Sequence, residues 1–292
     1  MQDIISKAST LLEALPYIQR FSGQIFVVKY GGSFMDSPDV AVRNGVARDI
    51  VFLEAVEINP VVVHGGGKAI TRAMAAAGIS ANFIQGQRVT DEATVEVVER
   101  VLSREINPDI VAMINSLGGC AQGFAGSDIF KCRQMFLTGP NGEKLDIGYV
   151  GEVTQVNIEP LLACLKAGAT PVISPTARGE VDGKVYNCNA DIAAAQTAIA
   201  LHAARLVFMS DVPGLMRDPK DLSTVIPNLR ISEVPALKAA GIVDQGMIPK
   251  IDSAVAAIES GLHKVSLVDG RVPHAVLLEI FTDAGLGTEV VP

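Results

Sequence analysis

Short runs of aliphatic residues recur along the chain, and several are followed by glycines and then by a stretch with helical spacing. Residues 25–30 precede the glycine pair at 31–32, and residues 60–64 precede the glycine triplet at 65–67. Continuous apolar strands that alternate with helices are typical of a parallel sheet covered on both faces. The pattern predicts an α/β fold, a three-layer αβα sandwich with a mainly parallel central sheet.

The same pattern places the remaining elements. Further strands are predicted over residues 170–174, 205–209 and 264–268. Helices are predicted over residues 68–77, 158–167, 190–204, 231–240 and 247–260, and over 37–58 with Ser37 as N-cap and Pro38 at the first helical position. Little helical spacing occurs within residues 120–157 and 179–187, where we expect antiparallel hairpins, the second turning at Asp182 and Gly183.

The first twenty residues carry a separate amphipathic pattern. Their apolar residues follow the spacing of one helix face: Ile4, Ile5, Ala8, Leu11, Leu12, Leu15 and Ile18. This face either packs back on its own domain or docks on another subunit. We divide the chain into an N-terminal helix (1–22) and two lobes (23–178 and 179–292).

Composition narrows the class of protein. The 292 residues are 49% hydrophobic, which excludes a disordered chain, and 32 acidic against 24 basic residues argue against nucleic-acid binding. No apolar run reaches the roughly 18 residues that a membrane span needs. The first ten residues lack a basic segment followed by an apolar block, so we expect no signal peptide. Four scattered cysteines suggest a reducing compartment, and we expect a soluble, cytoplasmic protein.

Several familiar catalytic motifs are missing from the sequence. It contains no GxSxG, no HExxH, no P-loop and no His/Cys cluster with metal-ligand spacing. Two glycine clusters after buried strands remain. Backbone N–H groups at such a loop, where a helix begins, can bind an anion. Because neighbouring parallel strands end at one sheet edge, we expect both loops to meet there.

Isolated charges accompany these loops. Lys29 is the only charge in its strand, and Lys250 stands among apolar residues near a helix start. Lys29 could be an edge lysine facing solvent, and Asn187, Asn189 and Asp191 could simply cap a helix. Taken together, cations, amide N–H groups and one carboxylate suit phosphoryl transfer, in which the protein positions the reactants and neutralises charge.

Eight segments carry a resemblance that covers the chain from about residue 26. They include VVKYGGS (27–33), VVVHGGG (61–67), QRVTD (87–91), YVGEV (149–153), NCNADIAA (187–194), MSDVPGL (209–215), GMIPK (246–250) and a last segment, 269–288, that opens with DGRVPH. With these segments in this order, the chain resembles the amino acid kinase family. The QRVTD and DGRVPH segments resemble its acetylglutamate branch.

The resemblance implies the amino acid kinase fold and an activity. The expected reaction is ATP-dependent phosphorylation of the γ-carboxylate of N-acetyl-L-glutamate, the second step of arginine biosynthesis. Residues 23–178 would bind the amino acid and form a dimer interface, and residues 179–292 would bind the nucleotide. Lys29 and Lys250 would stabilise the transferring phosphoryl group, and Asp191 would orient both lysines.

Other roles follow from the same resemblance. Substrate would contact Gly66, Gly67, Arg88, Asn187 and Asn189. Gly31 and Gly32 would bind the ATP phosphates, near Ser210 and Asp211 at the nucleotide. Mg²⁺ would arrive with ATP, without a dedicated set of protein ligands.

The two ends of the chain resemble arginine-inhibited members of the family. In those members an N-terminal helix interlaces dimers into a hexamer, a trimer of dimers. The resemblance implies an L-arginine site in the C-terminal lobe with Tyr17, His274, Glu279 and Gly287. The alternative for Glu279 is a solvated carboxylate at a helix end.

Two other functions stay open, and the chain departs from the family pattern at several positions. A sibling kinase could act on N-acetylaminoadipate or a related acidic amino acid, and a non-catalytic arginine-sensing subunit would be expected to lose Lys29, Asp191 or Lys250. The departures are Lys68 in place of proline, Gln245 in place of glycine, Ser127 in place of lysine, Gln196 in place of a small residue, and residues 103–105 in place of a stretch with glycine and lysine. None removes an expected catalytic group.

Overall fold

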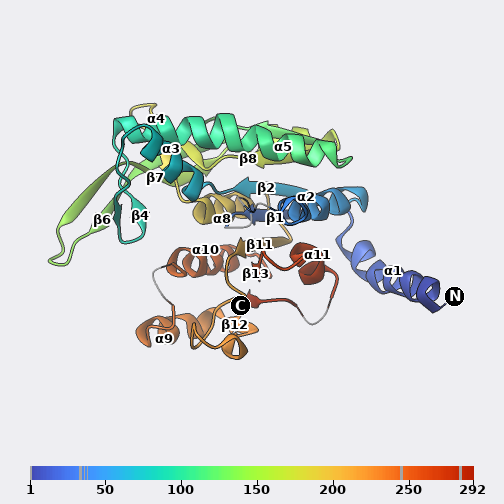
Figure 1. The fold of residues 1–292 in the computed structure, drawn as a ribbon. Coiled ribbons are helices and arrows are strands. Elements are labelled where there is room, and N and C mark those ends of the chain that lie inside the picture. The colour runs from blue at the N-terminus through green and yellow to red at the C-terminus, as the bar shows by residue number, and fades with distance from the viewer. Residues whose placement is uncertain (1, 33–34, 36, 38, 244–245, 283–284) are drawn as a thin grey trace.

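A central sheet of eight strands organises the computed structural model, which describes residues 2–32, 35, 37, 39–243, 246–282 and 285–292 (Figure 1). Its strands, in spatial order, are β12 (Asn228–Arg230), β14 (Thr288–Val291), β13 (Val265–Asp269), β11 (Arg205–Ser210), β1 (Ile25–Tyr30), β2 (Asn59–His64), β8 (Thr170–Ile173) and β5 (Ala121–Phe124). Neighbours are parallel except β13 and β14. The predicted, mainly parallel sheet is confirmed.

Helices cover both faces of this sheet. Alternate residues of β1 point to opposite faces, so that Val27 and Val28 belong to two different cores. The core around Val27 includes α7 (Glu159–Lys166), α8 (Ala190–Ala200) and α10 (Ile248–Glu259). The core around Val28 includes α2 (Val40–Ala55), α5 (Asn107–Ser116) and α11 (Ala275–Ile280). The three-layer αβα architecture is therefore confirmed.

Smaller elements lie at the edges of these layers. Three helical segments enclose a minor core beside the sheet: α3 (Gly67–Ala76), α4 (Glu92–Glu99) and the π-helical segment η2 (Arg100–Ile106), which continues directly into α5. The others are the hairpin β3 (Phe83–Ile84) and β4 (Gln87–Arg88), the short helices α6 (Gly126–Ile129) and α9 (Val234–Ala239), and 3₁₀ turns at Leu222–Thr224 and Ile231–Glu233.

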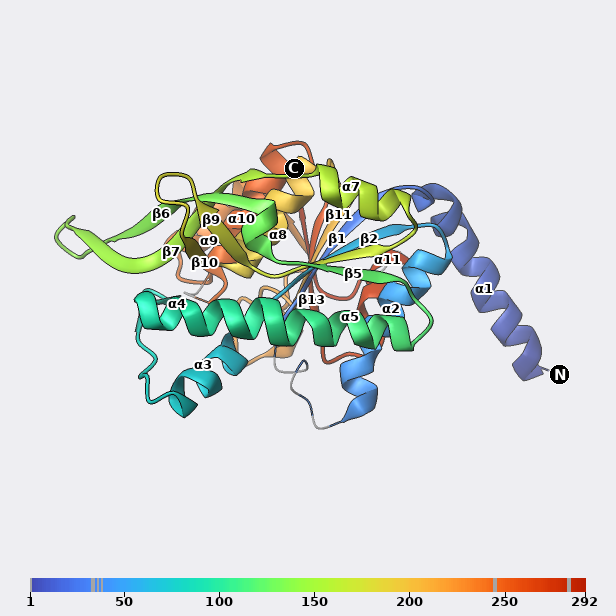
Figure 2. The same cartoon turned by 90° about the horizontal axis from the view of Figure 1, so that it is seen from above.

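A closed four-stranded barrel contains the two predicted hairpins. It is formed by β6 (Phe130–Thr138), β7 (Lys144–Val156), β9 (Thr176–Gly179) and β10 (Val185–Cys188). Strands β6 and β7 pair antiparallel and extend away from the body, as Figure 2 shows. Gly183 turns the second hairpin with a φ of 67°. One part of the prediction is wrong: residues 121–124 leave the hairpin region and pair parallel with β8 in the central sheet.

The start of α2 corrects a second prediction. The N-cap is Asp39, whose Oδ1 accepts a hydrogen bond of 2.8 Å from the Ala41 N–H, so Ser37 does not cap this helix. The hydroxyl oxygen of Ser37 instead accepts from the Asp39 N–H at 3.2 Å. Pro38 lies outside the described residues. Serine and aspartate compete for caps two residues apart, and the sequence alone does not decide between them.

Helix α1 (Gln2–Phe21) projects from the body and is anchored only at its end (Figure 1, Figure 2). Leu11 and Leu12 are 68% and 67% exposed, and Leu15 is also exposed. Phe21 is buried, and the Tyr17 ring packs edge-on against Phe281 with centroids 6.4 Å apart. The interpretation that the whole apolar face packs on its own domain is therefore wrong for residues 11–15.

The structure also bears on the expectations about membrane spans, cysteines and the lobe boundary. Among the described residues, none of the helices combines the length and apolar character of a membrane span. The four cysteines are free thiols. The lobe boundary near residue 178 stays a prediction. Strand β1 of the first lobe and β11 of the second pair directly, so one continuous sheet runs through both.

The buried histidine at the end of β2 makes stability depend on pH. Burial lowers the pKa of His64 to about 4, against 6.5 in an unfolded chain. Between these values only the unfolded chain binds the proton. The contribution of His64 to the free energy of unfolding is therefore highest above pH 6.5. It falls by about 1.4 kcal/mol for each pH unit between pH 6.5 and pH 4. We expect urea unfolding at pH 5.0 and 7.5 to show about 2 kcal/mol more pH dependence in the wild type than in His64→Asn. Equal pH dependence in both proteins would contradict this assignment.

Candidate active site

The two glycine loops lie side by side at the carboxyl edge of the sheet. Strands β1 and β2 are parallel with Tyr30 opposite His64, and the Gly65 N–H donates to the Tyr30 carbonyl at 2.7 Å. A Cβ built on Gly31 would lie 3.7 Å from the Gly65 Cα. The expected meeting of the two loops is confirmed, and backbone N–H groups from two strands are available at one point of the edge.

Two lysines from distant parts of the chain meet at one carboxylate. The Lys29 ammonium on β1 is 3.0 Å from Oδ1 of Asp191, and the Lys250 ammonium on α10 is 2.6 Å from Oδ2. A Cβ on Gly31 would lie 2.7 Å from the Lys29 Nζ, so this ammonium sits directly under the first glycine loop. The alternative that Lys29 faces solvent is wrong, because the side chain is buried.

Asp191 stays ionised in this cluster despite its burial. Burial by itself would raise the pKa of Asp191, but attraction to Lys29 and Lys250 outweighs it and lowers that pKa to about 2. Burial also lowers the pKa of Lys250, and Asp191 opposes that shift. An ionised aspartate thus holds two ammonium groups that would otherwise repel each other in a medium of low dielectric.

Helix α8 places Asp191 in the cluster. Asn189 is its N-cap, with Oδ1 accepting from the Asp191 N–H at 2.8 Å and from the Ile192 N–H at 3.3 Å. The capping interpretation is therefore confirmed for Asn189. Asp191 lies in the first turn, and its carboxylate points toward the lysines, so capping and charge placement come from the same short segment.

Arg88 is a buried cation beside the second glycine loop. Its guanidinium donates to the Gly67 carbonyl at 3.0 Å and to the Thr71 hydroxyl at 2.9 Å, and it stacks on the Phe83 ring, 4.6 Å from the centroid. Burial lowers its pKa. Among the described residues, no carboxylate lies within ion-pair distance of Arg88. A buried guanidinium without a carboxylate partner suits an anionic ligand.

Thr90 connects Arg88 to Asn187. Its buried hydroxyl donates to the Arg88 carbonyl at 2.8 Å and lies 3.5 Å from Nδ2 of Asn187. Gly148, at a φ of 77°, lets β7 approach, because a Cβ there would lie 2.1 Å from the Thr90 carbonyl oxygen. We missed Thr90 in the sequence, although it stands within the QRVTD segment.

A cavity of about 720 Å³ opens beside the glycine loops. Its lining includes Gly32, Gly66, Gly67, Lys68 and Asp211, but the lysine–aspartate cluster and Arg88 are outside it. We therefore place the reacting centre by the charged groups and not by this cavity. Asp211 and the buried Ser210 lie at the end of β11, the strand next to β1.

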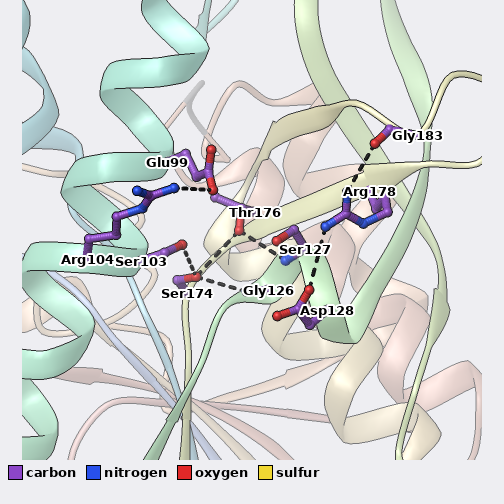
Figure 3. Close-up of polar contacts among 10 residues, drawn as sticks. All are labelled: Glu99, Ser103, Arg104, Gly126, Ser127, Asp128, Ser174, Thr176, Arg178 and Gly183. Carbon is purple, nitrogen blue, oxygen red and sulfur yellow. Dashed lines mark hydrogen bonds and ion pairs between the residues drawn. The ribbon is translucent and has the colours of Figure 1, made fainter.

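The departures Ser103 and Ser127 lie together near the end of β8 (Figure 3). The Ser103 and Ser174 hydroxyls are 2.8 Å apart, and Ser174 also accepts from the Gly126 N–H at 2.9 Å. The Ser127 N–H donates to the Thr176 hydroxyl at 3.1 Å. The Ser103 hydroxyl and the Ser127 backbone thus bond to neighbouring hydroxyls that follow β8, and Lys29, Asp191 and Lys250 keep their arrangement. Gln245 lies outside the described residues.

Tyr17, Glu279 and His274, which were expected at one arginine site, divide between two cavities. Tyr17 and Glu279 line one of about 170 Å³, together with Arg20, Arg205, Lys264 and Glu289. Glu279 is buried, accepts from the Ser266 hydroxyl at 2.7 Å and from the Leu286 N–H at 2.9 Å, and lies 3.3 Å from the Lys264 ammonium. The alternative of a solvated helix-end carboxylate is therefore wrong.

His274 and Gly287 have other surroundings. His274 lines a second cavity, and its Nδ1 lies 2.7 Å from Oδ1 of the buried Asp49. A Cβ on Gly287 would lie 1.9 Å from the Leu267 carbonyl oxygen, so this position accepts only glycine. The structure therefore brings Tyr17 and Glu279 to one cavity without His274.

The acidic side chains of the described residues do not gather into a metal-binding cluster. In the part of the chain that the structure describes, no three His, Cys, Asp or Glu side chains gather as metal ligands. Both oxygens of Asp191 already face ammonium groups. A divalent cation at this edge of the sheet would therefore have to bring most of its ligands with it, as Mg²⁺ does with nucleotide phosphates.

Comparison with known proteins agrees with this geometry. Residues 24–269 match the model of the amino acid kinase family. The chain is 46% identical to an acetylglutamate kinase of Clostridium beijerinckii, over 97% of this chain and 98% of that protein. N-acetylglutamate synthase from Neisseria gonorrhoeae, at 26% identity, superposes with a TM-score of 0.83 in its complex with coenzyme A and N-acetyl-glutamate, and of 0.78 in that with coenzyme A and L-arginine. These superpositions cover 98% and 97% of this chain, but the chain spans only 63% and 65% of the synthase chains. The chain belongs to the amino acid kinase family.

Proposed function

We propose that this protein transfers the γ-phosphoryl group of MgATP to the γ-carboxylate of N-acetyl-L-glutamate, which yields N-acetyl-L-glutamyl 5-phosphate in the second step of arginine biosynthesis. The observation that carries the proposal is the pair of ammonium groups, 3.0 and 2.6 Å from the oxygens of Asp191, beside two glycine loops. The name of the relative from Clostridium beijerinckii supports the substrate.

The proposed chemistry needs no general base, because the nucleophile is already a carboxylate. An oxygen of that carboxylate forms a bond to the γ-phosphorus while the bond to the β,γ-bridging oxygen breaks, and the electron pair leaves with ADP. Lys29 and Lys250 stabilise the negative charge on the transferring group, and Asp191 keeps the two ammoniums at a fixed separation. Alignment of the two substrates supplies much of the remaining rate.

The acceptor binds around the second glycine loop in this proposal. The Gly66 and Gly67 N–H groups at the start of α3 hold the γ-carboxylate, and the helix dipole favours that anion. Arg88 pairs with the α-carboxylate, which supplies the counterion that this guanidinium lacks within the described residues. The side-chain amide of Asn187 binds the substrate. Asn189, two residues further on, lies near the substrate while it caps α8.

The nucleotide binds toward β11 in this proposal. Gly31 and Gly32 donate to the phosphates, Ser210 and Asp211 lie at the nucleotide, and Mg²⁺ arrives as part of MgATP. In this proposal, residues 23–178 bind the amino acid and form the dimer interface. Residues 179–292 bind the nucleotide. A cytoplasmic location stays part of the proposal.

We also propose feedback inhibition by L-arginine. The cavity of about 170 Å³ has the carboxylates of Glu279 and Glu289 for a guanidinium and the cations of Arg20 and Arg205 for an α-carboxylate. The synthase from Neisseria gonorrhoeae that was crystallised with L-arginine supports this ligand. His274 and Gly287 lie at the two ends of the segment that carries Glu279, outside the lining of this cavity. Because α1 supplies Tyr17 and Arg20, ligand binding there is coupled to the helix that interlaces dimers into a hexamer.

An assay of ADP release tests the activity. Acetylglutamate, acetylaminoadipate, glutamate and aspartate are compared with and without L-arginine. We expect the highest kcat/KM for acetylglutamate. Preference for the longer homologue would favour the sibling kinase, and absence of turnover with all four acids would favour a non-catalytic sensor.

Replacing Lys29 tests the phosphoryl clamp. We expect Lys29→Ala to lower kcat at least about a hundredfold, because one preorganised donor to transition-state charge is lost. The control Lys166→Ala removes an exposed lysine on α7 and should keep the wild-type kcat. Wild-type turnover in a folded Lys29→Ala variant, checked by circular dichroism, would remove Lys29 from the mechanism.

Replacing Arg88 tests the acceptor site. We expect Arg88→Lys to raise the KM for acetylglutamate at least about tenfold and to leave the KM for MgATP nearly unchanged, because an ammonium cannot replace the planar guanidinium contacts. Arg104→Lys, on an exposed helix face, is the matched control. An equal rise in both KM values would place Arg88 outside the acceptor site.

A charge on the exposed face of α1 tests the assembly. We expect the wild type to be hexameric by light scattering and Leu12→Glu to be dimeric, with basal activity intact and a weaker arginine response. Gln19→Glu adds the same charge at an exposed polar position of α1 and should stay hexameric. A hexameric Leu12→Glu variant would contradict docking through this face. The point substitution is preferred to deletion of residues 1–20, because the deletion would also remove Tyr17 and Arg20 from the proposed arginine cavity.

A further inference from the structure

The imidazole at the end of β2 forms hydrogen bonds on both sides. His64 is completely buried, its Nδ1 is 2.9 Å from the Gly65 carbonyl oxygen, and its Nε2 is 3.3 Å from Nδ2 of Asn107. Asn107 is the first residue of α5, immediately after the π-helical segment. None of the roles proposed above uses this pair.

The surroundings of Asn107 determine which imidazole nitrogen carries the hydrogen. Its Nδ2 lies 2.9 Å from the Val172 carbonyl oxygen, which can only accept, so the amide must present its NH₂ group there. The second hydrogen of that NH₂ then points to Nε2 of His64, which acts as the acceptor. In a neutral ring the hydrogen is therefore on Nδ1, and Nδ1–H donates to the Gly65 carbonyl.

This donation fixes the direction of the next N–H group. A trans peptide is planar, so its C=O and the following N–H point in opposite directions, and the described chain has no cis peptide. Once the Gly65 carbonyl is held by His64, the Gly66 N–H must point away from the imidazole. Gly66 is the N-cap of α3, where the helix itself offers this N–H no partner.

Packing restricts the same residue from the other side. A Cβ on Gly66 would lie 2.6 Å from methyl carbons of Leu102 and Ile106, which belong to the π-helical segment. The π-helical segment thus packs closely against Gly66. Asn107, directly after the segment, determines the tautomer of His64. Two contacts from one stretch of chain therefore hold the loop in one conformation.

We infer that His64 and Asn107 are positioning residues that hold the Gly65–Gly66 peptide so that the Gly66 N–H is presented to the attacking carboxylate before substrate binds. This inference rests on the proposed function, in which Gly66 binds that carboxylate. A donor that is already aimed needs no reorganisation during the reaction, which is the condition under which such groups contribute most.

Two substitutions of His64 separate positioning from packing. Asparagine can place its NH₂ group where Nδ1–H lies, whereas leucine fills a similar space without a donor. We expect His64→Leu to raise the KM for acetylglutamate and to lower kcat, each about tenfold, with the KM for MgATP changed less than about twofold. His64→Asn should stay within about threefold of the wild type in both parameters.

Replacement of the asparagine tests the second half of the network. Asn107→Ala should raise the KM for acetylglutamate in the same way as His64→Leu. The matched control is Asn115→Ala, on the same helix, because Asn115 accepts from the Ala121 N–H at 2.7 Å and does not contact the glycine loop. Equal kinetics for folded His64→Leu and His64→Asn, or unchanged KM in folded Asn107→Ala, would overturn the inference.

A spectroscopic measurement on the wild type covers the case in which the variants do not fold. Nitrogen-15 NMR of the imidazole should show the Nδ1–H tautomer of His64 at pH 7, and the Nε2–H tautomer would overturn the inference. Wild-type turnover of acetylglutamate is the control for the proposed function. If that turnover were absent, the proposed function would fail, and the tautomer would still decide whether His64 holds the Gly65 carbonyl.

Discussion

The arrangement of this site depends on one buried carboxylate between two ammonium groups. Lys29 and Lys250 come from opposite ends of the sequence, and in a medium of low dielectric they would repel each other strongly without Asp191. An unpaired buried charge is far more destabilising than a pair, so the three groups persist only together. The elements that pack around this edge of the sheet must therefore keep Lys29, Asp191 and Lys250 within ion-pair distance.

The fold meets this requirement through small residues. Helix α8 is rich in alanine, and Ala193, Ala194 and Ala198 are buried in the core that also contains Val27 of β1 and Ile251 of α10. Short side chains let the helices and the sheet approach closely. The first turn of α8 then lies within reach of both lysines, and the Asn189 cap fixes where that turn begins.

Sequence reasoning succeeded where chemistry is local and failed where distant segments decide. The meeting of the glycine loops followed from two consecutive parallel strands, and the Asn189 cap followed from residue type. The π-helical segment, which packs Leu102 and Ile106 against Gly66, has no such local signature and was not predicted. Strands β12 and β14, at one end of the sheet, were missed because long-range pairing defines them. His274 was grouped with Glu279 although its ring pairs with Asp49.

The two glycine loops differ in the group that supports them, and the difference suits the proposed reaction. Lys29 lies under Gly31, where phosphate charge has to be neutralised. A neutral His64 lies under Gly65, beside the place that the proposed reaction gives to the attacking carboxylate. A cation there would stabilise that carboxylate before the reaction as much as during it, and such uniform binding lowers KM without raising kcat. A buried, uncharged imidazole can aim the Gly66 N–H without adding that charge, so in the proposed reaction the burial of His64 would serve the chemistry as well as the core.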